Sequence, residues 1–546
     1  MTSFDFDFET QKIFNKQFSQ IPRTDWKKWL DISSKEEYEE LAIKNSGLSS
    51  TEDIFERIKK EKKDSKELSI DPYNLLEKTD TSEELIVCHS SGTTNNDLSA
   101  LKWLHMSKEV IQNYWAPGMQ AIFESSGLTS TSTVVIFIPS RLQNDGLNLY
   151  NEKCFVSLYT AEFSQRLMLS LLKPNSYSFF EYKNSKNLEI ITKILSLDQI
   201  SAVSAPASTV LGWADINNFK NGIRNSLNLI KDIHDPLLEK FLLKINKEGI
   251  DKTAKELQDL LSQKLSEGTV VFGISSLSED DWNKIRTFMN WEKGEEKFVN
   301  LYVASEIGPF AASITRDDYN FSRSGNLFVF PLTLPVIESN GKKELISRSR
   351  GKIGRLLISK VNNSKPFFNL DIGDIIKIEN QEALPQINGK ILRSSFQLNY
   401  KVNVSKEIQL PLNYRVYAGD YFEFKTFKVY DPRSILNCLK MNCNLEFDSL
   451  LLLNNKKIND SNWKIVLLSN DKEKCSKVDI YREILINCIS NHEFREKIKE
   501  KSIKLQLIKE NPINFLATRS DMLSKVRRGK NPKGILKKWP LYVIEG

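Results

Sequence analysis

The sequence predicts an α/β fold built on a largely parallel sheet, and three observations carry that prediction. Short runs of β-branched residues alternate with helical stretches up to about residue 305. From about residue 325 the chain becomes β-rich with Gly and Asn turns, and beyond residue 408 a mixed α/β segment follows. Buried strands that alternate with helices are typical of parallel sheets, whose ligands lie in loops at the carboxyl ends of the strands.

Each element follows from its local pattern. The first 80 residues are polar with helical spacing and show no chemistry of their own. Four strand-like runs come next: STVVIFIPS (132–140), ISAVSAPAS (200–208), GTVVFGISS (268–276) and KFVNLYVAS (297–305). GISS and VASE would lie at carboxyl ends of strands. Pieces such as GKIGRLLISK and DIGDIIKIE predict a smaller β-subdomain.

Composition limits the possible classes of protein. A chain of 546 residues is too long for one core, so two to four domains are expected. The sequence has no apolar run of eighteen residues, so no membrane span is predicted. Its N-terminus is acidic, so no secretory signal is predicted either. The four histidines are dispersed, which disfavours metal binding by histidine and cysteine. The cysteines form no CxxC pair and are expected to be scattered, reduced thiols of a cytoplasmic protein: Cys88, Cys154, Cys438, Cys443, Cys475 and Cys488.

One loop stands out before the first of these strands. CHSSGTTNN places small residues in an unbroken row: Ser90, Ser91, Gly92, Thr93 and Thr94. Such a run neither packs a core nor favours a helix, but its hydroxyls and amides can surround an anion. No GK[ST] follows, so the spacing is not that of a Walker A loop. Taken alone, the stretch fits a phosphate-binding loop and an ordinary loop equally well.

Three further stretches follow this loop in order: NLYVASEIG (300–308), then GKIGRLLIS with PFFNLDIGDIIKI, and LRSSFQLNYKVNVS (392–405). Together the four resemble the phosphate loop, the NxYGxTE motif, the G-x-x-G-x-L strand with its GD motif, and the domain-crossing stretch of the adenylate-forming (AMP-binding) superfamily. The resemblance is closest to the phenylacetate–CoA ligase and LuxE-type acyl-protein synthetase branch, and it covers roughly positions 80–410.

The resemblance implies a large N-terminal domain with mostly parallel, doubly wound sheets plus a β-subdomain, and a small mobile α+β C-terminal domain. We therefore expect a helical N-terminal region of the large domain over 1–80. The adenylate-forming core should span 81–392, with its β-subdomain from about 325. Residues 393–546 should form the small C-terminal lid domain.

The resemblance also implies roles for single residues. Ser90, Ser91, Thr93 and Thr94 would hold the β- and γ-phosphates of ATP, with Gly92 admitting the backbone. Glu306 would hold Mg²⁺, which prefers hard oxygen ligands, and Ser305 could reach the α-phosphate. Tyr302 would lie along the adenine ring, Asp374 would bind the ribose hydroxyls, and Arg393 would contact ribose or phosphate. The plain alternatives are a solvated loop carboxylate for Glu306, a half-buried core tyrosine for Tyr302 and a turn aspartate for Asp374.

A catalytic cation is expected near the C-terminus. MLSKVRRGKNPKGILKKW (522–539) contains seven basic residues and no acid. A solvated surface segment would have the same composition. The resemblance implies that one lysine here offsets the charge that develops on the α-phosphate. Lys525 is the candidate, and Lys530 and Lys533 compete with it.

The implied function is ATP-dependent activation of a small carboxylic acid to an acyl-adenylate, followed by transfer to a thiol of CoA or of a protein. Several positions depart from the family pattern: Asn95 and Val303 replace glycines, Lys102 comes about four residues late, and Val402 stands where a glycine helps admit CoA. An amide-forming ligase and a non-catalytic nucleotide-binding module therefore remain alternatives. Nucleic-acid binding ranks last, because only Trp539 is interleaved with the basic residues of the tail.

Overall fold

A computed structural model describes most of the chain. The described residues are 7–48, 54–78, 84–90, 102–141, 145–230, 235–273, 279–292, 294–314, 326–362, 365–381, 384–388, 391–398, 415–443, 450–454, 463–469, 478–509 and 540–546. They fall into two compact units, which are described separately. The first comprises the described parts of 1–90, 102–372 and 376–390, and the second those of 373–375 and 391–546.

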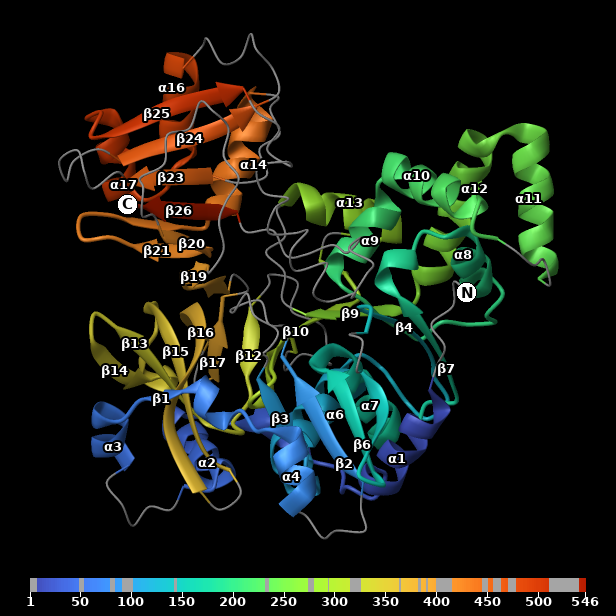
Figure 1. The fold of residues 1–546 in the computed structure, drawn as a ribbon, viewed down its shortest axis with the longest axis horizontal. Coiled ribbons are helices and arrows are strands. Elements are labelled where there is room, and N and C mark those ends of the chain that lie inside the picture. Colours follow the sequence, from blue (N-terminus) through green and yellow to red (C-terminus); the bar gives the residue numbers. More distant parts are fainter. Residues whose placement is uncertain are drawn as a thin grey trace. The chain divides into compact units, whose positions relative to one another are not determined.

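A parallel sheet lies at the centre of the first unit (Figure 1). Its strands are β4 (Thr133–Ile138), β7 (Ser176–Glu181), β8 (Ala202–Ser204), β9 (Thr269–Gly273) and β10 (Phe298–Ala304), in the order β10-β9-β8-β4-β7. Every neighbouring pair among these five is parallel. The four strand-like runs of the sequence are thus confirmed as neighbours in one parallel sheet, and β7 is the added member.

Helices cover both faces of this sheet. One side chain cluster joins Val135, Val203 and Val270 to the helices on one face. Those helices are α8 (Leu188–Leu195), α9 (Ala207–Ala214), α10 (Ile216–Leu227), α11 (Pro236–Glu248), α12 (Ile250–Leu265) and α13 (Glu279–Met289). On the other side, α7 (Thr160–Leu172) contacts β4 and also the strands of a second sheet. The mixed α/β class that the sequence predicts is confirmed.

A second sheet contains the strand that leads into the Ser90–Thr94 stretch. Its order is β3-β2-β6-β5, with β2 (Leu85–His89), β3 (Trp103–His105), β5 (Gly146–Tyr150) and β6 (Lys153–Tyr159). All five residues of β2 are buried, and β2 runs parallel to β6. The chain therefore leaves β2 at Ser90 and returns to the sheet at β3, beside the point where β6 leads into α7.

The predicted β-rich segment is present, and its strands continue the parallel sheet. β11 (Gly308–Ala312), β12 (Leu327–Val329), β17 (Leu384–Ile387) and β16 (Lys365–Gln381) follow β10 in the sheet order, each antiparallel to the strand before it. Beyond β16 lie β15 (Ile353–Asn362), β13 (Leu334–Ser339) and β14 (Lys342–Leu345).

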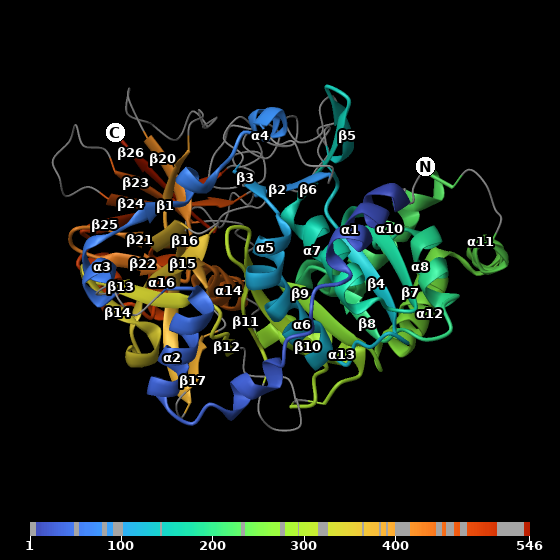
Figure 2. The same cartoon turned by 90° about the horizontal axis from the view of Figure 1, so that it is seen from below.

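The N-terminal region is helical, as its pattern predicts. It contains α1 (Phe8–Phe18), α2 (Lys35–Ser46), α3 (Ile54–Lys60) and α4 (Pro72–Lys78), with short 3-10 turns at Trp26–Asp31 and Ser65–Leu68 and a two-residue strand β1 (Lys63–Asp64). Along the chain between β3 and β4 lie α5 (Lys108–Val110), a π-helical turn at Ile111–Trp115, and α6 (Ala116–Ser125). Figure 2 shows α1 alongside α7, and Gln11 of α1 donates to the carbonyl of Arg166 at 3.2 Å.

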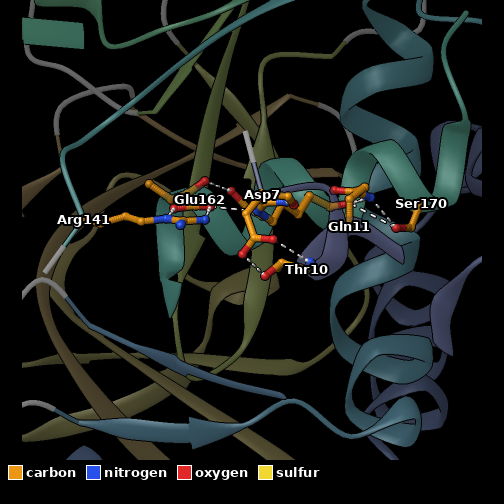
Figure 3. A network of polar contacts seen from close by, with 9 residues as sticks. Asp7, Thr10, Gln11, Arg141, Glu162 and Ser170 are labelled. Carbon is orange, nitrogen blue, oxygen red and sulfur yellow. Dashed lines mark hydrogen bonds and ion pairs between the residues drawn. The ribbon is translucent and has the colours of Figure 1, made fainter. Parts of the chain in front are cut away.

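A buried network of charges ties α1 to α7 (Figure 3). Glu162 accepts from Arg141 (Nε to Oε2, 2.8 Å) and from Arg166 (Nε to Oε1, 2.7 Å). Arg166 also donates to the carbonyl of Asp7 at 3.0 Å, and Asp7 caps α1 by accepting from the backbone N–H of Thr10. The network joins the start of α1 to the first turns of α7. Removal of one partner would leave a buried charge without compensation.

The second unit is a smaller α+β body. Its main sheet has the order β19-β20-β26-β23-β24-β25, over Phe396–Leu398, Arg415–Gly419, Leu541–Glu545, Leu450–Asn454, Trp463–Ser469 and Ile503–Lys509. The hairpin β21 (Tyr421–Glu423) and β22 (Lys428–Tyr430) and the helices α14 (Pro432–Cys443), α16 (Val478–Cys488) and α17 (His492–Lys499) complete it. Among the residues described in both units, no helix combines the length and apolar character that crossing a membrane requires.

The expectation that all cysteines are scattered, reduced thiols is wrong for one pair. Cys438 and Cys488 form a disulfide. The two residues are separated by 50 positions, and the packing of α14 against α16 brings them together. That packing depends on tertiary structure, so the spacing of the cysteines gave no sign of it. Cys88 and Cys154 are free.

Candidate functional site

A tight turn between β10 and β11 presents Ser305 and Glu306. The strands pair antiparallel, with Ala304 opposite Gly308, and the backbone N–H of Ile307 closes the turn on the carbonyl of Ala304 at 3.1 Å. Gly308 has φ +75°, and a Cβ there would lie 2.8 Å from the carbonyl oxygen of Tyr114. Glycine is therefore required at this position, where the backbone approaches the π-helical turn closely.

Glu306 forms an ion pair with Lys102. The carboxylate side chain is 6% exposed and the lysine 16%, so solvent screens this pair only weakly. The Lys102 ammonium also donates to Ser65 Oγ at 3.1 Å. Lys102, which comes late in the sequence pattern, thus reaches the carboxylate that the pattern singles out. Ser65 was missed, since no motif marks it.

Ser305 belongs to a chain of hydroxyl groups. Thr160 Oγ1 donates to the carbonyl of His89 at 2.8 Å and lies 2.8 Å from Ser305 Oγ. A hydroxyl has one proton, so Thr160 accepts from Ser305, and Ser305 keeps only its lone pairs for another partner. Thr160, the first residue of α7, is a second site residue that the sequence did not reveal.

The described end of the predicted phosphate loop is held firmly. The backbone N–H of Ser90 donates to the carbonyl of Lys102 at 3.1 Å, which joins the residues on either side of 91–101. Ser91, Gly92, Thr93 and Thr94 lie outside the described residues. The neighbouring Cys88 is buried, and burial raises the pKa of its thiol far above the usual range. A thiolate nucleophile at Cys88 is therefore disfavoured.

Tyr302 lies on β10 and is 6% exposed. Its ring meets the ring of Phe310 edge to face, with 5.7 Å between the centroids. The backbone N–H of Asn300, two residues earlier, donates to Ser313 Oγ at 2.8 Å, and the carbonyl of Asn300 accepts from the backbone N–H of Ser313 at 2.8 Å. Tyr302 is thus more buried than a half-buried core tyrosine would be.

Asp374 and Arg393 belong to the second unit. They face each other across the antiparallel pair of β16 and β18 (Leu392–Arg393), and Asp374 is 6% exposed. The carbonyl of Gly373 accepts from both the backbone N–H and the hydroxyl of Ser394, each at 3.0 Å. The side chain of Arg393 is outside the described residues, as are Lys525, Lys530 and Lys533.

The structure thus brings Ser305 and Glu306 together with Ser90 and Lys102 in the first unit. Within the described residues, no three His, Cys, Asp or Glu side chains gather around a common point. The donor set is one buried carboxylate with nearby hydroxyls and an ammonium. Mg²⁺ is commonly held by one or two carboxylates together with substrate phosphates, so this set fits a metal that arrives with a nucleotide.

Comparisons with known proteins bear on the fold. No family model and no curated protein matches the sequence. Among solved structures, the chain is similar to the AtGH3.15 acyl acid amido synthetase in complex with 2,4-DB, at 13% identity and TM-score 0.47 over 97% of this chain and 92% of that one. It is also similar to a 2-hydroxyisobutyryl-CoA ligase in complex with 2-HIB-AMP, at 9% identity and TM-score 0.42 over 93% and 87%.

A third similar structure is the amide bond synthetase McbA from Marinactinospora thermotolerans, at 11% identity and TM-score 0.40 over 82% and 69%. These solved structures are all of adenylate-forming enzymes, the superfamily that the four sequence motifs resemble. With TM-scores below 0.5, the likeness carries no argument about substrate or mechanism, and these rest on the residues of this chain.

Proposed function

We propose that the protein is an ATP-dependent, AMP-forming ligase that activates a small carboxylic acid. A carboxylate oxygen of the acid attacks the α-phosphorus of ATP, the bond from that phosphorus to the bridging oxygen breaks, and pyrophosphate leaves. A thiol, of CoA or of a carrier or acyl-accepting protein, then attacks the acyl carbon, loses its proton and displaces AMP. Such phosphoryl chemistry depends mainly on positioning and on stabilisation of charge.

The observation that carries the proposal is the Lys102–Glu306 pair at the end of β10. A carboxylate for the metal and a cation for phosphate lie together beside Ser90, where the hydroxyl-rich loop begins. In this proposal Glu306 would hold the Mg²⁺ that accompanies ATP, and Lys102 would turn from the carboxylate to the phosphates. When bound, Mg²⁺ would neutralise charge on the phosphate oxygens.

The remaining roles follow the family resemblance. Ser305 would lie at the α-phosphate, where its hydroxyl would donate to a phosphate oxygen once its proton turns away from Thr160. Tyr302 would contact adenine, Asp374 the ribose hydroxyls, and Arg393 ribose or phosphate. The β- and γ-phosphates would be held by Ser90, Ser91, Gly92, Thr93 and Thr94.

The position of Lys102 favours an enzyme over a non-catalytic module of the same fold. In the sequence, this late lysine was one reason to consider a module that had lost its chemistry. In the structure its ammonium reaches Glu306 and Ser65. The late position therefore argues no longer against catalysis.

Adenylation also needs a cation for the charge that develops on the α-phosphate. We assign it to Lys525, with Lys530 and Lys533 as competitors, on a small C-terminal lid domain over 393–546. A cation required only in the transition state raises the rate of adenylation without raising the affinity for ATP.

The acceptor is proposed as a thiol, following the phenylacetate–CoA ligase and LuxE-type branch. Val402, at a position where glycine helps admit the CoA arm in that branch, favours a protein thiol or an amine over CoA. An amide-forming ligase is therefore the second candidate, distinguished by whether an amine or a thiol accelerates AMP release. An ATP-consuming reaction of this kind fits the cytoplasm, although the Cys438–Cys488 disulfide is uncommon in that compartment.

Nucleotide binding is the first test. Millimolar ATP or AMP with Mg²⁺ should raise the melting temperature, with a stabilisation that approaches about 2.7 kcal/mol at a concentration of 100 Kd. Asp374→Ala should reduce that gain, because the ribose hydroxyls lose their acceptor. The measurement is differential scanning fluorimetry across a nucleotide titration. Absence of any shift in the unsubstituted protein would remove the basis of the proposal.

A further inference from the structure

A buried pair, His89 and Asp145, lies beside this site. His89 directly precedes Ser90 in the phosphate-loop motif, but the motif gives it no role, and Asp145 lies outside all four motifs. His89 ends β2, and Asp145 directly precedes β5. Their side chains are 2% and 1% exposed, and His89 Nε2 lies 2.8 Å from Asp145 Oδ1. The imidazole also packs edge-on to Trp103, with 4.9 Å between the ring centroids. The ring is therefore fixed in orientation.

The second ring nitrogen of His89 contacts Ser90. His89 Nδ1 lies 3.0 Å from the carbonyl oxygen of Ser90, which can only accept, so Nδ1 carries a proton and donates. Nε2 faces a carboxylate, and a second proton must lie between those two atoms, since otherwise two acceptors would meet at 2.8 Å. The pair satisfies all its partners only when it holds both protons.

Asp145 interacts electrostatically with Arg141, a member of the charged network that ties α1 to α7. Gly146 has φ +121°, and a Cβ there would lie 3.2 Å from Arg141 Nη1, so the chain passes directly over this guanidinium. Burial opposes the charge of Arg141, but Glu162, Asp7 and Asp145 outweigh it and raise the pKa of Arg141. Asp145 thus lies near a guanidinium that is itself paired with Glu162 (Figure 3 shows Arg141 with Glu162).

The contacts of Ser90 connect the pair to the candidate site. His89 holds the Ser90 carbonyl, and the Ser90 N–H donates to the carbonyl of Lys102. Lys102 carries the ammonium that meets Glu306. The carbonyl of His89 itself accepts from Thr160, the partner of Ser305. One ring orientation therefore sets the backbone beside both functional side chains.

We propose that His89 and Asp145 are positioning residues of the nucleotide site. They fix the peptide of Ser90 and, through it, the backbone of Lys102, without touching the reacting atoms. The inference rests on the proposed function for its consequence: loss of the Ser90 contact should weaken the binding of the ATP phosphates. The binding of the acid should be unaffected.

Three substitutions at His89 separate positioning from packing. In His89→Asn the amide nitrogen takes the place of Nδ1, which keeps the donor to Ser90. In His89→Gln the amide takes the place of Nε2, which keeps only the contact with Asp145. His89→Phe keeps a ring and neither hydrogen bond. Asp145→Asn can donate to Nε2 and so preserve Nδ1–H, whereas Asp145→Ala cannot.

We expect MgATP affinity, measured by isothermal titration calorimetry, to stay within about threefold of the unsubstituted protein in His89→Asn and Asp145→Asn. It should fall about tenfold or more in His89→Gln, His89→Phe and Asp145→Ala, the scale of one hydrogen bond. KM for ATP should follow the same order while KM for the acid stays constant. Melting temperatures without nucleotide serve as the control for folding.

Two results of the binding measurements would overturn the inference. One is equal MgATP affinity in His89→Asn and His89→Gln; the other is a phenylalanine variant that binds as the unsubstituted protein does. Nitrogen NMR of labelled histidine, assigned by comparison with His89→Asn, should show a proton on Nδ1 of His89. If the unsubstituted protein fails to bind MgATP, the proposed function fails. Independently of that result, an unprotonated Nδ1 in the spectrum would contradict the hydrogen bond from His89 to Ser90 on which the inference rests.

Discussion

Replacement of Glu306 by glutamine should reduce acid-dependent pyrophosphate release by about 100-fold or more, since a metal ion at developing phosphate charge contributes several kcal/mol. Glutamine keeps the shape of the side chain at the turn between β10 and β11 and removes only its charge. The loss should be largest at low Mg²⁺ and persist at saturating Mg²⁺. The measurement is a coupled pyrophosphate assay across a Mg²⁺ titration at fixed ATP.

Lys102→Gln is the matched control, because it breaks the same ion pair from the other side. It leaves the carboxylate in place and should retain activation by Mg²⁺, with a raised KM for ATP. If the two variants lose activity with the same Mg²⁺ dependence, Glu306 acts through the ion pair alone. Unchanged pyrophosphate release in Glu306→Gln would exclude the metal role.

The second large effect concerns Lys360, a lysine buried in the first unit. Its ammonium donates to the carbonyls of Asn113 (2.7 Å) and Leu332 (3.0 Å) and lies 3.7 Å from the centroid of the Tyr114 ring. These contacts support the charged form, but none of them supplies a counter-charge. Burial outweighs them and lowers the pKa of Lys360 to about 7.

The folded protein should therefore gain stability as the pH rises from 7 towards 10. Over that window the unfolded chain holds a proton on Lys360 that the folded protein lacks, so the free energy of unfolding rises with pH, by up to about 1.4 kcal/mol per pH unit. Lys360→Met should lack this rise. The measurement is urea denaturation at pH 7, 8.5 and 10, followed by tryptophan fluorescence, since seven of the nine tryptophans lie before residue 391.

The exposed Lys365, at the start of β16, supplies the control. Lys365→Met should run parallel to the unsubstituted protein at all three pH values. Parallel behaviour of Lys360→Met as well would show that the buried ammonium keeps its proton throughout.

The strands of the parallel sheet could be predicted because their buried positions are filled by runs of β-branched and apolar residues. Val134 to Ile138 of β4 are buried one after another, as expected for a strand covered on both faces. β7 was missed because its sequence, SYSFFE, is half polar. Its first three residues, Ser176 to Ser178, are only partly buried. Local pattern cannot distinguish such an edge strand from a loop.

The site was predictable where chemistry is clustered in sequence and hidden where it depends on the fold. Ser305 and Glu306 stand in one motif. Lys102 meets Glu306 across 204 positions, and Thr160 and Asp145 are single polar residues in unremarkable surroundings. The pairing of β2 with β6 and of β5 with β6 brings Thr160 and Asp145 beside β2, and the pairing of β2 with β3 does the same for Lys102.

Acid-dependent pyrophosphate release across a panel of carboxylic acids shows whether this chain forms acyl-adenylates, as we claim. We expect that at least one acid, with ATP and Mg²⁺ both present, yields pyrophosphate and AMP in equal amounts. Release should stop when any of the three components is withheld. A panel that gives only the background seen without acid, or orthophosphate with ADP in place of pyrophosphate with AMP, would contradict the claim.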